Sequence, residues 1–181
     1  IMRVPMYATG IRTGTMIPDT TPAVLNETPS VIHLDARYGL GPVSAVRAVD
    51  LAAGKARETG VGCVSMVNAN DVARLGSYMA SPATDGFVAI MFVNDAGGNP
   101  AVAPWGSVRA FLSTNPLAAG IPWRLDCPVV VDMSTSVAAA GKLKTLKAEG
   151  KDAPEGWLID GTGRPTTSVT EARAIPPEHP L

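Results

Sequence analysis

The stretch from Val129 to Lys142 constrains the fold of this chain more than any other segment. It begins with three β-branched residues, typical of a short buried strand, and the strand ends in Asp132. The Ser134-Thr-Ser136 run that follows can cap a helix starting near Val137. Such a strand-to-helix turn presents free N–H groups and the positive end of a helix, which suits a phosphate or a carboxylate. An ordinary connection with a good N-cap is the simpler interpretation of the turn alone.

Strand and helix patterns alternate through the centre of the chain. The expected elements are a strand at 31–34, an alanine-rich helix from 43 to about 58 that Gly60 stops, a strand at 61–67, a helix at about 74–80 that breaks at Ser81-Pro82, and strands at 87–93 and 129–131. The unbroken apolar run from Phe87 to Val93 is typical of a strand covered on both faces. The alternation predicts an α/β fold with a mixed sheet flanked by helices.

Proline- and glycine-rich segments surround this centre. Residues 1–30 are expected to form the end of a helix and then an extended arm, and residues 150–181 to form loops and turns. Residues 94–128 combine Gly, Pro and Asn with Trp105 and Trp123, and a structureless stretch of that length is usually functional or part of an interface. The 181 residues are expected to fold as a single domain, 1–181.

The composition argues against several functional classes. The net charge is -1 and the basic residues are scattered, so no nucleic-acid or lipid surface is expected. Cys63 and Cys127 are expected to be buried small hydrophobes in a reducing compartment, and His33 and His179 are too few for a histidine-based metal site. With neither a run of about 20 apolar residues nor a signal peptide visible, the expected location is the cytoplasm.

Six motifs follow one another along the chain. They are Arg3-Val-Pro-Met-Tyr7, Gly39-Leu-Gly41, Val67-Asn-Ala-Asn-Asp71, Ser113-Thr-Asn-Pro116, Asp132-Met-Ser-Thr-Ser136 with Gly141-Lys142, and Pro154-Glu-Gly-Trp157 with Asp160 and Pro165-Thr-Thr167. In this order they resemble the malate/L-lactate dehydrogenase family that lacks a Rossmann domain. That family includes ureidoglycolate, sulfolactate and diketogulonate dehydrogenases and piperideine-2-carboxylate reductases. The resemblance covers most of the chain and is far more specific than any single motif.

The resemblance implies a non-Rossmann fold that binds NAD or NADP, and a homodimer. The implied reaction moves a hydride between the cofactor and the carbon that bears a hydroxyl or an imine nitrogen next to a carboxylate. The family also has a histidine-glycine pair before the position of Ile1 and a glycine-rich region after that of Leu181. A core fragment or a divergent short form is therefore expected.

Arg3 and Tyr7 are the candidate substrate-binding residues. The planar guanidinium of Arg3 can hold both oxygens of a carboxylate, and Tyr7 follows four residues later on the same helical face. The resembling family binds its substrate at these positions. The alternative for Arg3 is an ordinary surface arginine.

Asp71 is the candidate catalytic residue, and it stands where the family has a proton-transferring histidine. An ordinary aspartate has a pKa of about 3.9, against about 6.5 for histidine. To donate a proton near neutral pH, its pKa would have to rise by about 3, which corresponds to about 4 kcal/mol. An ionised Asp71 would also repel a substrate carboxylate. The alternative for an aspartate that opens a loop is a helix cap.

The remaining candidates would contact the cofactor. Ser134 and its neighbours offer hydroxyls at a helix N-terminus, while Lys142, one to two turns into that helix, reads equally well as a solvated lysine. Asp95 can accept a ribose hydroxyl or open a plain turn, and Ser113 replaces a family glycine. Trp157 is expected to be a structural anchor. The full cofactor set is Asp95, Thr114, Asn115, Pro116, Asp132, Met133, Ser134, Thr135, Ser136 and Lys142.

Two other functions stay open beside a 2-hydroxy acid dehydrogenase. A homologue with impaired catalysis would bind the dinucleotide or a partner on the same scaffold. An imine- or amine-specific reductase would use Asp71 to attract a cationic substrate. The sequence leaves open which 2-oxo acid or imine is the substrate, and whether the cofactor is NAD or NADP.

Overall fold

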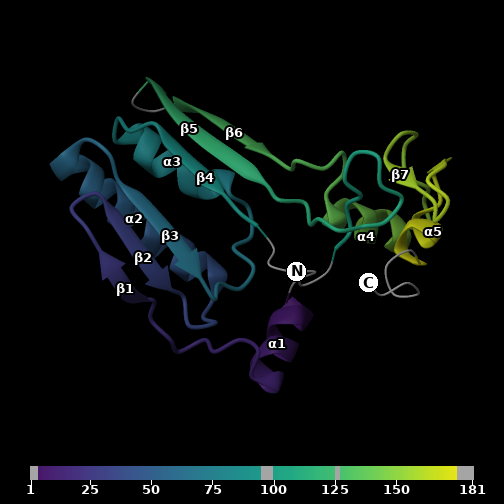
Figure 1. The fold of residues 1–181 in the computed structure, drawn as a ribbon, viewed down its shortest axis with the longest axis horizontal. Coiled ribbons are helices and arrows are strands. Elements are labelled where there is room, and N and C mark those ends of the chain that lie inside the picture. The colour runs from purple at the N-terminus through teal and green to yellow at the C-terminus, as the bar shows by residue number, and fades with distance from the viewer. Residues whose placement is uncertain (1–3, 95–99, 125–126, 175–181) are drawn as a thin grey trace. The chain divides into compact units, whose positions relative to one another are not determined.

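The computed structural model describes residues 4–94, 100–124 and 127–174, which form two compact units. One unit comprises Ile1–Ala89 with Ala119–Val130, and the other comprises Ile90–Ala118 with Val131–Leu181. Figure 1 traces the elements in chain order. They are α1 (Val4–Thr13), β1 (Ala23–Glu27), β2 (Val31–Asp35), α2 (Gly41–Thr59), β3 (Cys63–Val67), α3 (Gly76–Thr84), β4 (Ala89–Phe92), β5 (Leu117–Arg124), β6 (Cys127–Met133), α4 (Ala140–Ala148), β7 (Leu158–Ile159), β8 (Pro165–Thr166) and α5 (Val169–Ala174).

The first unit contains the mixed sheet that the sequence predicts. The order is β1-β2-β3, with β1 antiparallel to β2 and β2 parallel to β3. Helix α2 makes the connection between the two parallel strands and packs on one face of the sheet. Ile32 and Leu34 from β2 and Ala48 from α2 form the buried cluster there. The predicted α/β class is therefore confirmed.

Helix α2 begins and ends where local chemistry requires. Pro42 lies in its first turn, where a missing N–H costs no helical hydrogen bond. At the other end, Gly60 adopts φ 83 and donates its N–H to the Ala56 carbonyl, which is the left-handed cap that glycine tolerates best. The predicted helix at 43–58, stopped by Gly60, is correct to within two residues.

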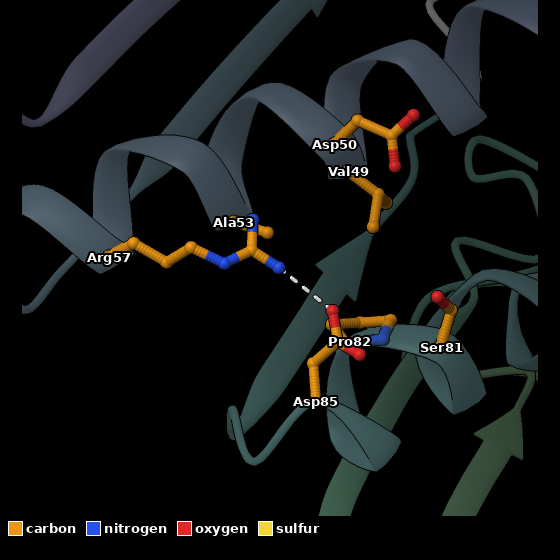
Figure 2. A pocket seen from close by; sticks show the side chains of 7 residues that line it. All are labelled: Val49, Asp50, Ala53, Arg57, Ser81, Pro82 and Asp85. Atoms are coloured by element: carbon orange, nitrogen blue, oxygen red, sulfur yellow. Dashed lines mark hydrogen bonds and ion pairs between the residues drawn. The ribbon is translucent and has the colours of Figure 1, made fainter.

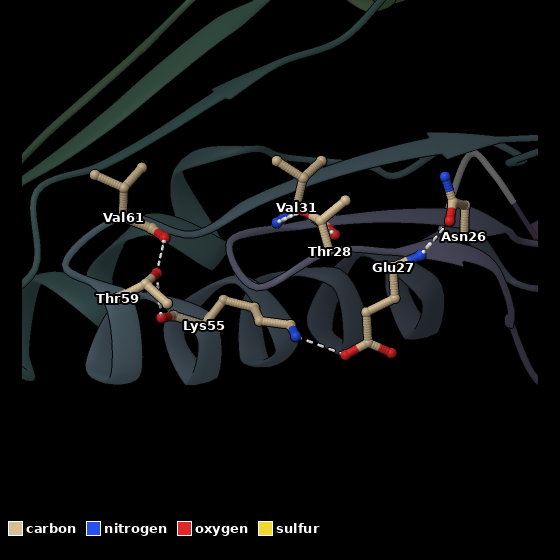
Figure 3. A network of polar contacts seen from close by, with 7 residues as sticks. All are labelled: Asn26, Glu27, Thr28, Val31, Lys55, Thr59 and Val61. Carbon is tan, nitrogen blue, oxygen red and sulfur yellow. Dashed lines mark hydrogen bonds and ion pairs between the residues drawn. The ribbon is translucent and has the colours of Figure 1, made fainter.

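A polar network ties β1 to the last turns of α2 (Figure 3). The Lys55 ammonium lies 2.6 Å from a Glu27 carboxylate oxygen, and the Lys55 side chain is only 15% exposed. The Thr59 hydroxyl donates to the carbonyls of Lys55 and Val61, at 3.0 and 2.8 Å. These contacts hold the hairpin edge of the sheet to its covering helix.

Helix α3 corrects the prediction of a break at Ser81-Pro82. The helix continues to Thr84, although Pro82 has no N–H for the carbonyl one turn earlier. Met79, Pro82 and Ala83 are all buried, so their packing compensates for the lost hydrogen bond.

Strand β4 belongs to a second sheet of order β4-β5-β6. The prediction that residues 87–93 are covered on both faces is wrong for this chain. Ile90 and Phe92, which lie on the same face of β4, are 58% and 72% exposed. Residues 94–128 are not structureless either, because β5 and the isolated bridge Val102–Leu112 lie within them. Strand β6 also extends beyond the predicted residues 129–131.

Both cysteines are exposed, which corrects the prediction that they are buried. Cys63 and Cys127 each begin a strand, and exposed residues alternate with half-buried ones along β3 and along the first five residues of β6. Both cysteines thus lie in strands, but their side chains are on the exposed face of the strand.

The second unit has a small core of its own near the C-terminal end. Ala153, Leu158 and Val169 are buried, and Leu143, Leu146 and Trp157 pack against them. Trp157 is therefore the structural anchor that the sequence predicts. The prediction of only loops and turns after residue 150 is wrong, because the β7-β8 pair and α5 supply this core. Within the described residues, no helix combines the length and apolarity needed to cross a bilayer.

Candidate functional site

The loop that carries Asp71 leaves the sheet beside the loop that follows β2. Strands β2 and β3 are parallel and in register, with Asp35 opposite Val67, so both loops start at the same edge. Two backbone hydrogen bonds join the loops. Ala36 N–H donates to the Val67 carbonyl and Tyr38 N–H donates to the Asn68 carbonyl, both at 2.9 Å.

Left-handed backbone is concentrated in these two loops. Arg37, Tyr38, Asn68 and Ala73 have φ of 52, 56, 54 and 61°. Such angles are unfavourable for residues with a side chain, and they persist only where the surrounding contacts impose them. They occur often at active sites and ligand clamps, which makes this edge of the sheet a candidate site.

Asp35 holds the base of the two loops together. Its carboxylate accepts hydrogen bonds from the Arg37 N–H at 2.8 Å and the Asn68 amide at 3.0 Å. These two bonds hold the pKa of Asp35 below its usual value, and the bond from Arg37 has the larger effect. Because the folded-state pKa is lowered, this stabilisation is present at neutral pH and is lost as the pH falls through that pKa.

Asp71 organises a turn of its own. Its Oδ1 accepts a hydrogen bond from the Ala73 N–H at 2.9 Å, and helix α3 begins only at Gly76. Asp71 therefore caps the turn that precedes α3.

Tyr78 of α3 interacts with the Asp71 loop and with Tyr7 of α1. The Tyr78 hydroxyl donates to the carbonyl of Val72, the residue after Asp71. Burial raises the pKa of Tyr78, and the nearby Tyr7 phenol raises it further. Tyr78 thus interacts both with Tyr7 of α1 and with the residue that follows Asp71, while Arg3 lies outside the described residues.

In the second unit, two segments that the sequence predicts separately lie side by side. The Ser134 hydroxyl donates to the Thr114 carbonyl at 3.1 Å. Thr135 donates its N–H to the same carbonyl and its hydroxyl to the carbonyls of Thr114 and Asn115, at 3.0 to 3.1 Å. Pro116 accepts a hydrogen bond from the Val93 N–H at the end of β4. Asp95, two residues further, lies outside the described residues.

The serine and threonine hydroxyls do not cap a helix, and this corrects the predicted helix start near Val137. Helix α4 begins at Ala140, and its N-cap Ala139 makes no side-chain cap bond. The Ser136 hydroxyl donates to the Ala138 carbonyl at 2.9 Å and lies 2.6 Å from the Ser134 hydroxyl. The hydroxyls of Ser134, Thr135 and Ser136 donate to backbone carbonyls of the loops, and so they stabilise the loop conformation and not a helix end.

The other cofactor candidates are placed as follows. Asp132 and Met133 are the last residues of β6 and are exposed. Lys142 lies in the first turn of α4, not one to two turns into it, and its ammonium is 5.6 Å from the centre of the Trp157 ring. That contact packs Lys142 on the anchor Trp157, whereas the sequence predicts either a cofactor contact or a solvated lysine.

Asn115 has a buried side-chain oxygen that is not paired within the described residues. Its φ is 32°, and its Oδ1 is buried without a hydrogen-bond partner in the described part of the chain. A buried acceptor left unpaired costs about 1–3 kcal/mol. The loop therefore offers a prepared acceptor to a ligand that carries an N–H or O–H group.

A hollow in the first unit, of about 180 Å³, contains none of the predicted site residues (Figure 2). It lies between α2 and α3, and Arg57 and Asp85 form an ion pair across it at 2.8 Å. The Arg57 guanidinium also lies 5.3 Å from the centre of the Phe87 ring. These contacts fasten the end of α2 to the end of α3.

Sequence reasoning singled out Asp71 in its loop but missed Asp35, Asn68, Asn70 and Tyr78. The available signal was the pair of asparagines in Val67-Asn-Ala-Asn-Asp71, because asparagine adopts left-handed backbone readily and carries an amide that can join two loops. Nothing in the sequence indicates that Tyr78 reaches the Val72 carbonyl.

Comparison with known proteins places this chain in a family. The malate/L-lactate dehydrogenase family model matches residues 1–176. Malate dehydrogenase of Pyrococcus horikoshii is 38% identical over 171 residues, which are 94% of this chain and 46% of that protein. The (2R)-3-sulfolactate dehydrogenase (NADP(+)) of Chromohalobacter salexigens is 37% identical over 174 residues, 96% of this chain and 51% of that protein.

A solved structure supports the same assignment. The delta1-piperideine-2-carboxylate reductase of Pseudomonas syringae pvar. tomato matches with a TM-score of 0.84 and 30% identity, over 97% of this chain and 51% of that one. This chain thus spans about half the length of the relatives it matches. It belongs to the malate/L-lactate dehydrogenase family.

Proposed function

We propose that this chain is part of a nicotinamide-dependent oxidoreductase that acts on a small 2-hydroxy or 2-oxo acid. Membership of the family is the observation that carries the proposal. The paired loops at Thr114 and Ser134 support it, because they are two of the family motifs and lie against each other in one unit.

The residues of these loops fit a nicotinamide dinucleotide. Asn115 Oδ1 is a buried acceptor, and the carboxamide and ribose groups of such a cofactor are N–H and O–H donors. Ser134, Thr135 and Ser136 would hold the loop in shape, and Thr114, Pro116, Asp132 and Met133 would line it. Lys142 and Asp95, which is outside the described residues, are the remaining candidates for contact with the cofactor. When bound, the nicotinamide supplies or accepts the hydride at the carbon that carries the substrate oxygen.

The chain's own residues would hold the substrate and move one proton. The Arg3 guanidinium would bind the substrate carboxylate through two hydrogen bonds, with the Tyr7 hydroxyl beside it. Asp71 occupies the position from which a proton would pass to or from the substrate oxygen. The protein expressed from its complete reading frame should therefore be assayed with NADH and NADPH against 2-oxo acids such as pyruvate and oxaloacetate.

Reduced dinucleotide is expected to bind saturably whether or not turnover is fast. Titration of NADH and of NADPH, followed by tryptophan quenching and nicotinamide emission, measures the Kd of each. Asn115→Ala should weaken binding about tenfold, since a hydrogen bond to a buried acceptor contributes about 1.5 kcal/mol. Asn26→Ala, in β1, is the matched control. Absence of saturation with both cofactors up to millimolar concentration would contradict the proposed cofactor.

A second function, reduction of a cyclic imino acid, is favoured by Asp71. An aspartate at this position attracts a protonated imine nitrogen, whereas it repels the carboxylate of a 2-oxo acid, which has no cationic group to offset the repulsion. Turnover confined to imines would support this function. Saturable dinucleotide binding with no turnover of either class would instead indicate a catalytically impaired homologue.

We also propose that the protein forms a homodimer. Trp105 and Phe111 are exposed in the segment that the sequence predicts as an interface, and Ile17 is exposed in the predicted arm. Large apolar side chains left exposed favour association with another chain. Light scattering at micromolar concentration should give twice the mass of the protein expressed from its complete reading frame. A monomer mass would refute the dimer.

A further inference from the structure

We propose that Asn70 is a positioning residue, whose side-chain amide fixes the Asp71 loop to two other segments of the first unit. This inference rests on the proposed function, because it assigns Asn70 a task in the same site.

The Asn70 amide reaches three backbone carbonyls. Its Nδ2 lies 2.7 Å from the Tyr38 carbonyl oxygen, 3.1 Å from that of Gly39 and 3.4 Å from that of Thr15, so its two hydrogens are shared among three acceptors. Tyr38 and Gly39 belong to the loop after β2, and Thr15 follows α1, the helix that carries Tyr7. One side chain therefore connects the loop of Asp71 with both neighbouring segments.

The same carbonyl of Tyr38 also accepts the Ile17 N–H at 2.9 Å. Its two lone pairs are thus used by the arm after α1 and by the Asn70 amide. Tyr38 has a left-handed φ of 56°, so this carbonyl is held in place by contacts and not by backbone preference.

Asparagine fits this task because its amide offers two N–H groups on one uncharged nitrogen. An aspartate would set carboxylate lone pairs against carbonyl oxygens, and an apolar residue of the same shape would leave those carbonyls without the donor. The loop also packs closely against α2, because Gly41 in the first turn of that helix lies against the Asn70 and Asp71 carbonyls.

The consequence concerns the placement of Asp71. A displacement of about 1 Å in a reacting group can cost about 100-fold in rate. Loss of the Asn70 amide should therefore lower kcat while the Kd for NADH or NADPH stays unchanged, since the cofactor loops contain none of the residues that Asn70 contacts.

The test uses Asn70→Leu, which keeps the approximate volume and removes the donors, and Asn70→His, which keeps one N–H. Both are made in the native protein and in the Asp71→His background, with Asn26→Ala as control. Asn70→Leu should lower kcat about 100-fold with unchanged cofactor Kd, and Asn70→His should recover part of that loss. An unchanged kcat, or a loss that follows thermal stability and is not recovered by histidine, would overturn the proposal.

A second measurement separates this proposal from the proposed function. Hydrogen exchange of the Ala73 amide, which Asp71 Oδ1 accepts, reports the order of the loop without any turnover. Asn70→Leu should accelerate this exchange at least tenfold and leave that of Gly60, at the far end of α2, unchanged. If no variant turns over substrate, the proposed function fails, but hydrogen exchange of the Ala73 amide still tests the role of Asn70. Faster exchange in Asn70→Leu supports positioning by Asn70, and unchanged exchange refutes it.

Discussion

Replacing Asp71 by histidine is expected to raise kcat/KM for the reduction of 2-oxo acids by about 10²-fold or more. A well-matched general acid contributes typically about 10²–10⁴-fold. An aspartate can donate a proton near neutral pH only if its pKa is raised by about 3, and that requirement of about 4 kcal/mol forfeits most of the contribution. A histidine needs no such rise. The measurement is steady-state kinetics with NADH or NADPH and a panel of oxo acids and cyclic imino acids.

Asp71→Asn is the matched control for charge. It removes the negative charge near the substrate carboxylate but supplies no titratable group, so it should lower the KM for an oxo acid without the gain in kcat. If Asp71→His leaves oxo-acid turnover unchanged, or the native protein already turns over briskly, Asp71 is not the deficient proton donor. Loss of a native imine activity in Asp71→His would instead favour the imine reductase.

Gly41→Ala is expected to destabilise the protein by about 3 kcal/mol, or roughly 6–12 °C in Tm for a chain of this size. A Cβ at Gly41 would lie 2.2 Å from the Asp71 carbonyl oxygen and 2.4 Å from that of Asn70. Both are backbone atoms, which cannot rotate away as the end of a side chain can. Either α2 or the Asp71 loop must therefore move.

Gly54→Ala, in the same helix, is the control. A Cβ there would meet nothing within 4 Å, so the higher helix propensity of alanine should stabilise the protein by about 0.5–1 kcal/mol. Thermal unfolding of the two variants should give shifts of opposite sign. If both variants raise Tm, the close approach of α2 to the Asp71 loop is not present in solution.

The parts of the fold that the sequence predicts correctly are those with short-range signals. The strand-helix-strand unit from Val31 to Val67 is an example, since Pro42 and Gly60 mark the ends of its helix and apolar runs mark its strands. The errors arise where distant contacts decide. Pro82 stays within α3 because the helix is buried, and the Ser134 hydroxyl binds a carbonyl 20 residues away instead of capping α4.

The candidate site also combines residues that the sequence predicts with residues whose role depends on distant contacts. Asp71, Thr114 and Asn115 were identified from motifs, because a resemblance marks positions one at a time. The partners of Asn70 lie 31, 32 and 55 residues away along the chain, so no local pattern could reveal them. The unpaired Oδ1 of Asn115 is likewise a property of the folded environment and has no sequence signal.

The left-handed residues beside Asp71 have a thermodynamic consequence. Arg37, Tyr38 and Ala73 each adopt a backbone conformation that costs a residue with a Cβ about 1–2 kcal/mol, and glycine would remove that cost. Their sum is a substantial part of the 5–15 kcal/mol that typically separates folded from unfolded chains. The loops after β2 and β3 are therefore a region that gentle heating or dilute denaturant should loosen ahead of cooperative unfolding.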